Sequence, residues 1–109
     1  MIVDFAGIPE QKIPHFQGGE KEFAVRMLNA PACRILHGRL IPGASIGLHT
    51  HETSSEIIYV LSGSGKVLYD GAWEEISAGQ AHYCPKGHAH SLVNSGSEEL
   101  VFFAAVPEQ

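Results

Sequence analysis

Two stretches of this 109-residue chain decide its fold: GASIGLHTHETSSEIIYVLSG at residues 43–63 and GQAHYCPKGHAHSLVN at residues 79–94. Histidines, glycines and short apolar runs recur in both stretches. Written as spacings, the first is G-x5-H-x-H-x4-E-x6-G and the second is G-x5-P-x-G-x2-H-x3-N. The residues that define the two patterns are Gly43, His49, His51, Glu56 and Gly63, followed by Gly79, Pro85, Gly87, His90 and Asn94.

The whole chain has the pattern of β structure. Short apolar segments alternate with turn residues, and the Asp70-Gly71 pair is a strong hairpin signal. Residues 20–29 also fit a helical stripe, but the nearby Pro31 favours a strand. The predicted strands are 22–28, 33–41, 45–51, 56–61, 65–69, 73–76, 80–84, 89–94 and 100–106. Strands this short and this closely spaced predict an all-β jelly roll made of two sheets.

Four of the pattern residues are of the types that bind metals. In a strand, side chains two apart share a face, so His49 and His51 can converge on one ion. Glu56 begins the next strand after a polar turn, and His90 arrives from a later strand. Three imidazoles and one carboxylate suit one divalent transition metal ion (Mn, Fe, Co, Ni, Cu or Zn) and suit Ca or Mg poorly. A six-coordinate ion held by these groups would keep positions open for water, substrate or dioxygen.

Residues 43–94 resemble the paired signature of the cupin superfamily, with no position of either motif missing. The resemblance implies a double-stranded β-helix that holds one metal ion. The 15 residues between the motifs, 64–78, match the compact form of small single-domain cupins. We therefore expect one cupin domain over residues 1–109, in which residues 1–19 form an N-terminal arm.

Other motif residues have roles in the fold. The glycines Gly43, Gly63 and Gly79 lie between predicted strands, where a positive φ or a tight reversal is expected. The side-chain amide of Asn94 is expected to fix a turn.

Charge and composition exclude several classes of partner. The formal net charge is −5, and no run of Lys or Arg offers a basic surface for nucleic acid or for an anionic membrane. No stretch has the pattern of a secretory signal or of a membrane span, so we expect a cytoplasmic protein. Cys33 and Cys84 are too far apart for a C-x2-C metal clip, and we expect reduced thiols.

Two predicted strands, 56–61 and 100–106, have apolar residues on both alternating faces. The interior of a barrel hides only one face of each strand. A second subunit or the N-terminal arm must therefore cover the other face, and we predict a homodimer.

Two candidate catalytic residues, His82 and Tyr83, belong to one strand. His82 shares a face with Cys84, and Tyr83 shares the opposite face with Ala81. One of these pairs points into the pocket, where His82 or Tyr83 could act as a general acid or base. The nearby His88 is expected to be a turn residue.

A third candidate, Arg39, lies on the same face of its strand as His37, opposite Leu36 and Leu40. If the leucines pack inside, Arg39 is exposed to solvent. In the reversed register, Arg39 would bind a carboxylate or phosphate group in the pocket.

The cupin resemblance covers dioxygenases, decarboxylases, isomerases and lyases. It therefore implies a metal-dependent enzyme that acts on a small oxygen-rich molecule, and it does not choose the reaction. The alternative is a non-catalytic module that binds a metal or a small molecule in the barrel. A transcriptional sensor would ordinarily add a helix-turn-helix domain, and no segment fits one.

Overall fold

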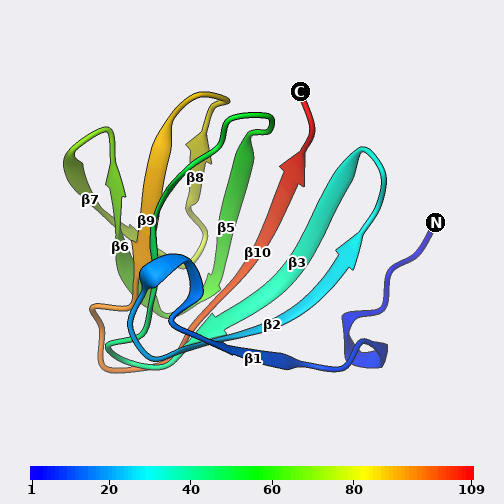
Figure 1. Ribbon diagram of the computed structural model, residues 1–109. Coiled ribbons are helices and arrows are strands. Elements are labelled where there is room, and N and C mark those ends of the chain that lie inside the picture. Colours follow the sequence, from blue (N-terminus) through cyan, green and yellow to red (C-terminus); the bar gives the residue numbers. More distant parts are fainter.

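The computed structural model describes residues 1–109 as two antiparallel β-sheets that face each other (Figure 1). The strands are β1 (Gln11–Pro14), β2 (Glu22–Asn29), β3 (Cys33–Leu40), β4 (Ser45–Thr50), β5 (Glu56–Ser62), β6 (Ser64–Tyr69), β7 (Ala72–Ser77), β8 (Ala81–Cys84), β9 (Ala89–Val93) and β10 (Leu100–Pro107), and the 3-10 helices are η1 (Phe5–Gly7) and η2 (Phe16–Gly18). Strands β2 to β10 confirm the predicted segments to within one residue at each end. No helix is long and apolar enough to cross a membrane.

The sheets have the topology of a double-stranded β-helix. The larger sheet has the order β1-β2-β3-β10-β5-β8, and the smaller has the order β4-β9-β6-β7. The last strand of the chain, β10, therefore lies between β3 and β5 in the middle of the larger sheet (Figure 1). This arrangement confirms the predicted all-β jelly roll.

An apolar core fills the space between the two sheets. Strand β10 shows how it is built, because its alternate residues Leu100, Phe102, Ala104 and Val106 are buried. The rings of Phe23 and Phe102 stack with their centroids 5.9 Å apart. Gly38 leaves room for these rings, since a Cβ there would lie 2.6 Å from Phe23 and 2.7 Å from Phe102.

The motif residues Gly63 and Asn94 have the expected roles in turns. Gly63 has a φ of +83°, and a Cβ there would clash with the carbonyl of Glu99. The Asn94 side-chain amide donates hydrogen bonds to the carbonyls of Leu40 and Glu98, each 2.8 Å long, and its oxygen accepts one from the Gly96 amide at 2.9 Å. These bonds tie the end of β9 to β3 and to the loop before β10.

The N-terminal segment covers part of the outer face of the larger sheet. Phe5 packs against His37 of β3 and Phe103 of β10, with ring centroids 6.0 and 6.2 Å apart, and Arg26 donates a 2.6 Å hydrogen bond to the carbonyl of Ile8. The outer face of the neighbouring β5 remains open. Its side chains Ile57, Tyr59 and Leu61 are 43%, 43% and 47% exposed.

Candidate metal centre

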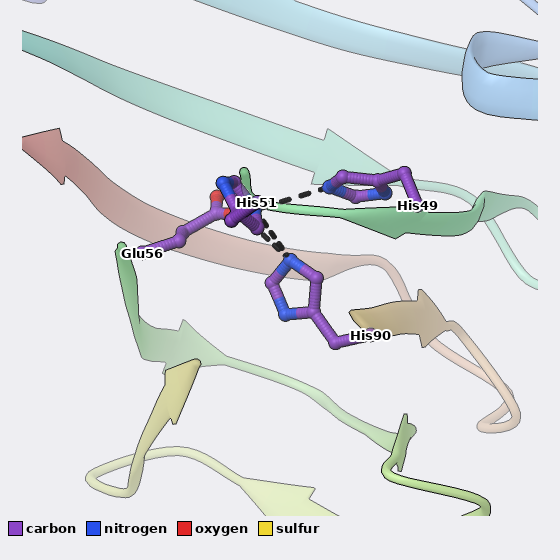
Figure 2. A group of neighbouring side chains, drawn as sticks. All are labelled: His49, His51, Glu56 and His90. Atoms are coloured by element: carbon purple, nitrogen blue, oxygen red, sulfur yellow. Dashed lines mark hydrogen bonds and ion pairs between the residues drawn. The ribbon is translucent and has the colours of Figure 1, made fainter. Parts of the chain in front are cut away.

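Four side chains from three different parts of the chain converge between the sheets (Figure 2). His49 lies on β4 directly opposite His90 of β9, His51 follows the end of β4, and Glu56 begins β5. The Nε2 atoms of His51 and His90 are 2.9 Å apart, and each is 2.9 Å from Oε1 of Glu56. Nε2 of His49 is 4.0 Å from the same oxygen. The structure thus brings together all four predicted ligands.

The second ring nitrogen of each histidine has its own partner. Nδ1 of His49 donates to the carbonyl of Gly47 at 2.8 Å, Nδ1 of His51 lies 3.0 Å from Oγ of Ser54, and Nδ1 of His90 lies 3.0 Å from Nε2 of His82. The Gly47 carbonyl can only accept, so Nε2 of His49 carries a lone pair and no proton. Nε2 of His51 and Nε2 of His90 each lie within hydrogen-bonding distance of Oε1 of Glu56, so in the metal-free protein they can donate to that oxygen, and a bound cation would take the place of those protons. Together the four side chains present three imidazole nitrogens and a carboxylate oxygen to one point, a donor set that fits a cation.

Electrostatics favour the protonation states that metal binding requires. Burial of Glu56 opposes its ionisation, but hydrogen bonds from His51 and His90 outweigh that effect and lower its pKa to about 2. Burial lowers the pKa of His49, despite the hydrogen bond to Gly47, which acts in the opposite direction. At neutral pH the carboxylate is therefore charged and the His49 imidazole is neutral.

The four side chains open into a cavity of about 340 Å³, which is large enough for a small molecule. Its apolar walls come from both sheets and from η2, and its polar lining beside the four side chains includes Arg34, Glu52 and Ser54. The apolar wall includes Phe16, Met27, Leu36, Ile46, Leu92 and Phe102. Coordination positions that the protein leaves free would face this space.

His82 and Cys84 point to the inside of the barrel, and Tyr83 points outward with 55% of its surface exposed. This settles which pair on β8 faces inward. His82 contacts His90 and does not line the cavity, and its pKa is lowered to about 4, first by burial and then by His90. Tyr83 lies outside the site. His88 is a turn residue whose Nδ1 is 2.8 Å from Oδ2 of Asp70 at the surface.

The alternative in which Arg39 reaches the pocket is wrong. Leu36 and Leu40 are buried, so Arg39 lies on the outer face of β3. There its Nε donates to Glu10 and its Nη1 donates to Glu99, each at 2.7 Å. These hydrogen bonds, first of all the one to Glu10, raise the pKa of Arg39 and hold the guanidinium away from the cavity.

Sequence reasoning missed Arg34, which lines the cavity. The signal was present in the sequence, because the alternation that places Leu36 and Leu40 inside also places Arg34 on the inner face. Reasoning from the sequence also missed Ser54 and the Gly47 carbonyl as partners of the histidines. Both depend on a local backbone path that the side-chain types do not encode.

Comparison with known proteins agrees with the fold. The cupin domain family matches residues 36–106, and the chain belongs to that family. It is therefore a small cupin with a cluster of three histidines and a glutamate that is consistent with a metal site.

One protein and two solved structures are similar to nearly the whole of this chain. An oxalate-binding protein of Thermotoga maritima is 32% identical over 114 residues, which cover 97% of this chain and 93% of that protein. The crystal structure of a predicted oxalate decarboxylase from the same organism matches with a TM-score of 0.94 and 31% identity, over 100% of both chains. A polyketide cyclase of Streptomyces resistomycificus matches with a TM-score of 0.80 and 26% identity, over 98% of this chain and 78% of the other.

Proposed function

We propose that this cupin holds one divalent transition metal ion at His49, His51, Glu56 and His90 and is an enzyme that acts on a small oxygen-rich molecule in the cavity. The observation that carries the proposal is the convergence of these four side chains at the end of a cavity of about 340 Å³. The relative from Thermotoga maritima makes oxalate the first molecule to test.

Each part of the site has a definite task. An ion held by His49, His51, Glu56 and His90 would supply a Lewis acid for an oxygen of the ligand. The protein orients the imidazoles through Gly47, Ser54 and His82, so that their Nε2 atoms are directed at the proposed ion. The apolar walls around the ligand exclude water and strengthen the electrostatic interactions within the cavity.

The test begins with protein loaded with Mn, Fe, Co, Ni, Cu or Zn in turn. Oxalate binding is measured by calorimetry, and turnover is followed as the formation of one formate and one carbon dioxide from each protonated oxalate. We expect oxalate to bind only to the metal-loaded protein, and turnover with at least one of the metals. Equal oxalate binding by metal-free protein would contradict the proposal.

A second candidate function is metal-dependent binding without turnover. One observation favours it: neither His82 nor Tyr83 lines the cavity, where the titratable side chains besides the four proposed ligands are Arg34 and Glu52. General acid-base catalysis by His82 or Tyr83 would require one of them to reach the ligand. Oxalate binding with every metal but no product after long incubation would establish this second function.

We also propose that the protein forms a homodimer, in which a second copy covers the outer face of β5. The exposed side chains Ile57, Tyr59 and Leu61 support this proposal, because the N-terminal segment reaches β3 and β10 and leaves them open. Light scattering should give the mass of two chains for the native protein and of one chain for Tyr59→Asp. A native mass of one chain would contradict it.

A further inference from the structure

Arg34 is an arginine inside the barrel, on a wall that it shares with the candidate metal centre. It pairs with Val106 of β10, and the next pair on the other side of β10 joins Ala105 to Ile57 of β5. Val106, buried on the inner face, therefore lies between Arg34 and Glu56 in one row across the larger sheet. Two strand spacings separate the backbones of Arg34 and Glu56, roughly 10 Å.

The guanidinium of Arg34 differs from the other arginines in having no partner within the protein. Arg39 is paired with Glu10 and Glu99, and Arg26 donates to the carbonyls of Phe5 and Ile8. Nε of Arg34 is the one buried side-chain nitrogen or oxygen of the chain without a hydrogen-bond partner. A buried donor without an acceptor costs free energy, so Nε of Arg34 is favourable here only if something else accepts its hydrogen bond.

The chemistry of the cavity identifies the acceptor. A guanidinium presents its donors in a planar fork that matches a carboxylate. Arg34 and a divalent ion together carry more positive charge than the single carboxylate of Glu56 neutralises. Glu52 also lines the cavity, but its side chain is exposed at the rim. The cavity therefore favours a small dianion, and its volume of about 340 Å³ excludes large ones.

We infer that Arg34 is the specificity-determining residue of this site and that it binds a second carboxylate group of a ligand whose first carboxylate lies on the metal. The substrate class is thus a small dicarboxylate. This inference rests on the proposed function, because it takes the metal centre as the other attachment point of the ligand.

The experiment compares oxalate with oxamate, which has the same shape but carries an amide in place of one carboxylate. Affinities are measured by calorimetry on metal-loaded native protein and on Arg34→Gln. We expect the native protein to prefer oxalate and Arg34→Gln to bind oxalate about tenfold to a hundredfold more weakly, as loss of a charge-assisted hydrogen bond implies. The preference for oxalate over oxamate should shrink in Arg34→Gln, an effect that a structural role alone would not produce.

Two further variants serve as controls. Arg34→Lys keeps the charge and loses the planar fork, so we expect an affinity between those of the native protein and Arg34→Gln. Arg39→Gln removes an arginine from the outer face of the same strand and should keep the native preference. All three variants should retain native metal content.

The outcomes separate this inference from the proposed function. Unchanged oxalate affinity and preference in metal-loaded Arg34→Gln would overturn the role of Arg34 and leave the metal-dependent function intact. Failure of the native protein to bind metal would overturn the proposed function itself. Native protein that binds one metal ion per chain but binds neither oxalate nor the longer malonate and succinate would overturn the dicarboxylate class and leave the metal centre in place.

Discussion

Two groups of potential metal ligands share His90, and they are organised differently. The first contains His49, His51, Glu56 and His90, and the second contains His82, Cys84 and His90. In the first group, the side chains point toward one another (Figure 2), and all four residues line the cavity. In the second group, Nε2 of His82 lies 3.0 Å from Nδ1 of His90, the ring nitrogen that points away from the first group. Sγ of Cys84 is 3.6 Å from the carbonyl of His88.

The difference teaches that residue type and proximity do not by themselves make a metal site. Burial raises the pKa of Cys84 to about 11, so its sulfur remains a protonated thiol near neutral pH. Glu56 is ionised and supplies the negative charge that the second group lacks. We therefore expect the first group to bind the metal and His82 to orient His90.

The largest expected effect is the loss of metal from His51→Ala. This change removes one ligand and leaves Glu56 with one hydrogen-bonded imidazole fewer. Elemental analysis should show about one transition metal ion per native chain and little in the variant, because incomplete coordination weakens binding strongly. His88→Ala, which changes a surface histidine outside both groups, is the matched control and should keep its metal. Full metal content in His51→Ala would contradict the assignment.

A smaller effect is expected when His82 is replaced. His82→Phe removes the partner of Nδ1 of His90, and loss of such a partner typically weakens metal binding by about 10–100-fold. His82→Gln can still accept a hydrogen bond and should recover much of the affinity. Competition with a chromophoric chelator measures both. If His82 were itself a metal ligand, the His82→Gln variant would bind metal no better than the His82→Phe variant.

Acid should destabilise the metal-free protein in two stages. Burial lowers the pKa of His49, and it lowers that of His82 from 6.5 to about 4. Below pH 6.5 the unfolded chain therefore binds protons that the folded chain does not, and stability falls as the pH falls towards the folded-state values. Glu56, whose pKa falls from 4.5 to about 2, adds a further loss below pH 4.5.

Urea unfolding at pH 7 and pH 5 measures the first stage. The midpoint should be lower at pH 5, and His82→Gln, which does not titrate, should reduce the difference. Equal midpoints for the native protein at the two pH values would show that these histidines titrate normally in the folded state.

The smallest effect on the metal is expected for Cys84→Ala. The side chain of Cys84 is fully buried, so its loss should lower the free energy of unfolding by about 1 kcal/mol. Metal content and affinity should remain native, as measured by elemental analysis and chelator competition. A marked loss of metal would place a thiolate in the coordination sphere and favour the second group.

The sequence predicted most of the fold because turn residues and alternating side chains mark strand boundaries locally. The ambiguous segment 20–29 became a strand, β2, which pairs with β3 over Ala24–Asn29. Short β1 was missed, since its four residues form a strand only by pairing with β2, and neither 3-10 helix was predicted. The four predicted ligands were found from the spacing of the two motifs and their resemblance to the cupin signature. To find Arg34, the alternation of inward-facing side chains had to be followed from Leu36 two residues back along the strand. The predicted homodimer stays a prediction.

X-ray absorption at the edge of the bound metal tests the central claim most directly. A site made of His49, His51, Glu56 and His90 predicts a shell of only nitrogen and oxygen atoms at about 2.0–2.2 Å, as for Zn²⁺, with multiple-scattering features of three imidazoles. A sulfur scatterer at about 2.3 Å, or features of fewer than three imidazoles, would contradict the account.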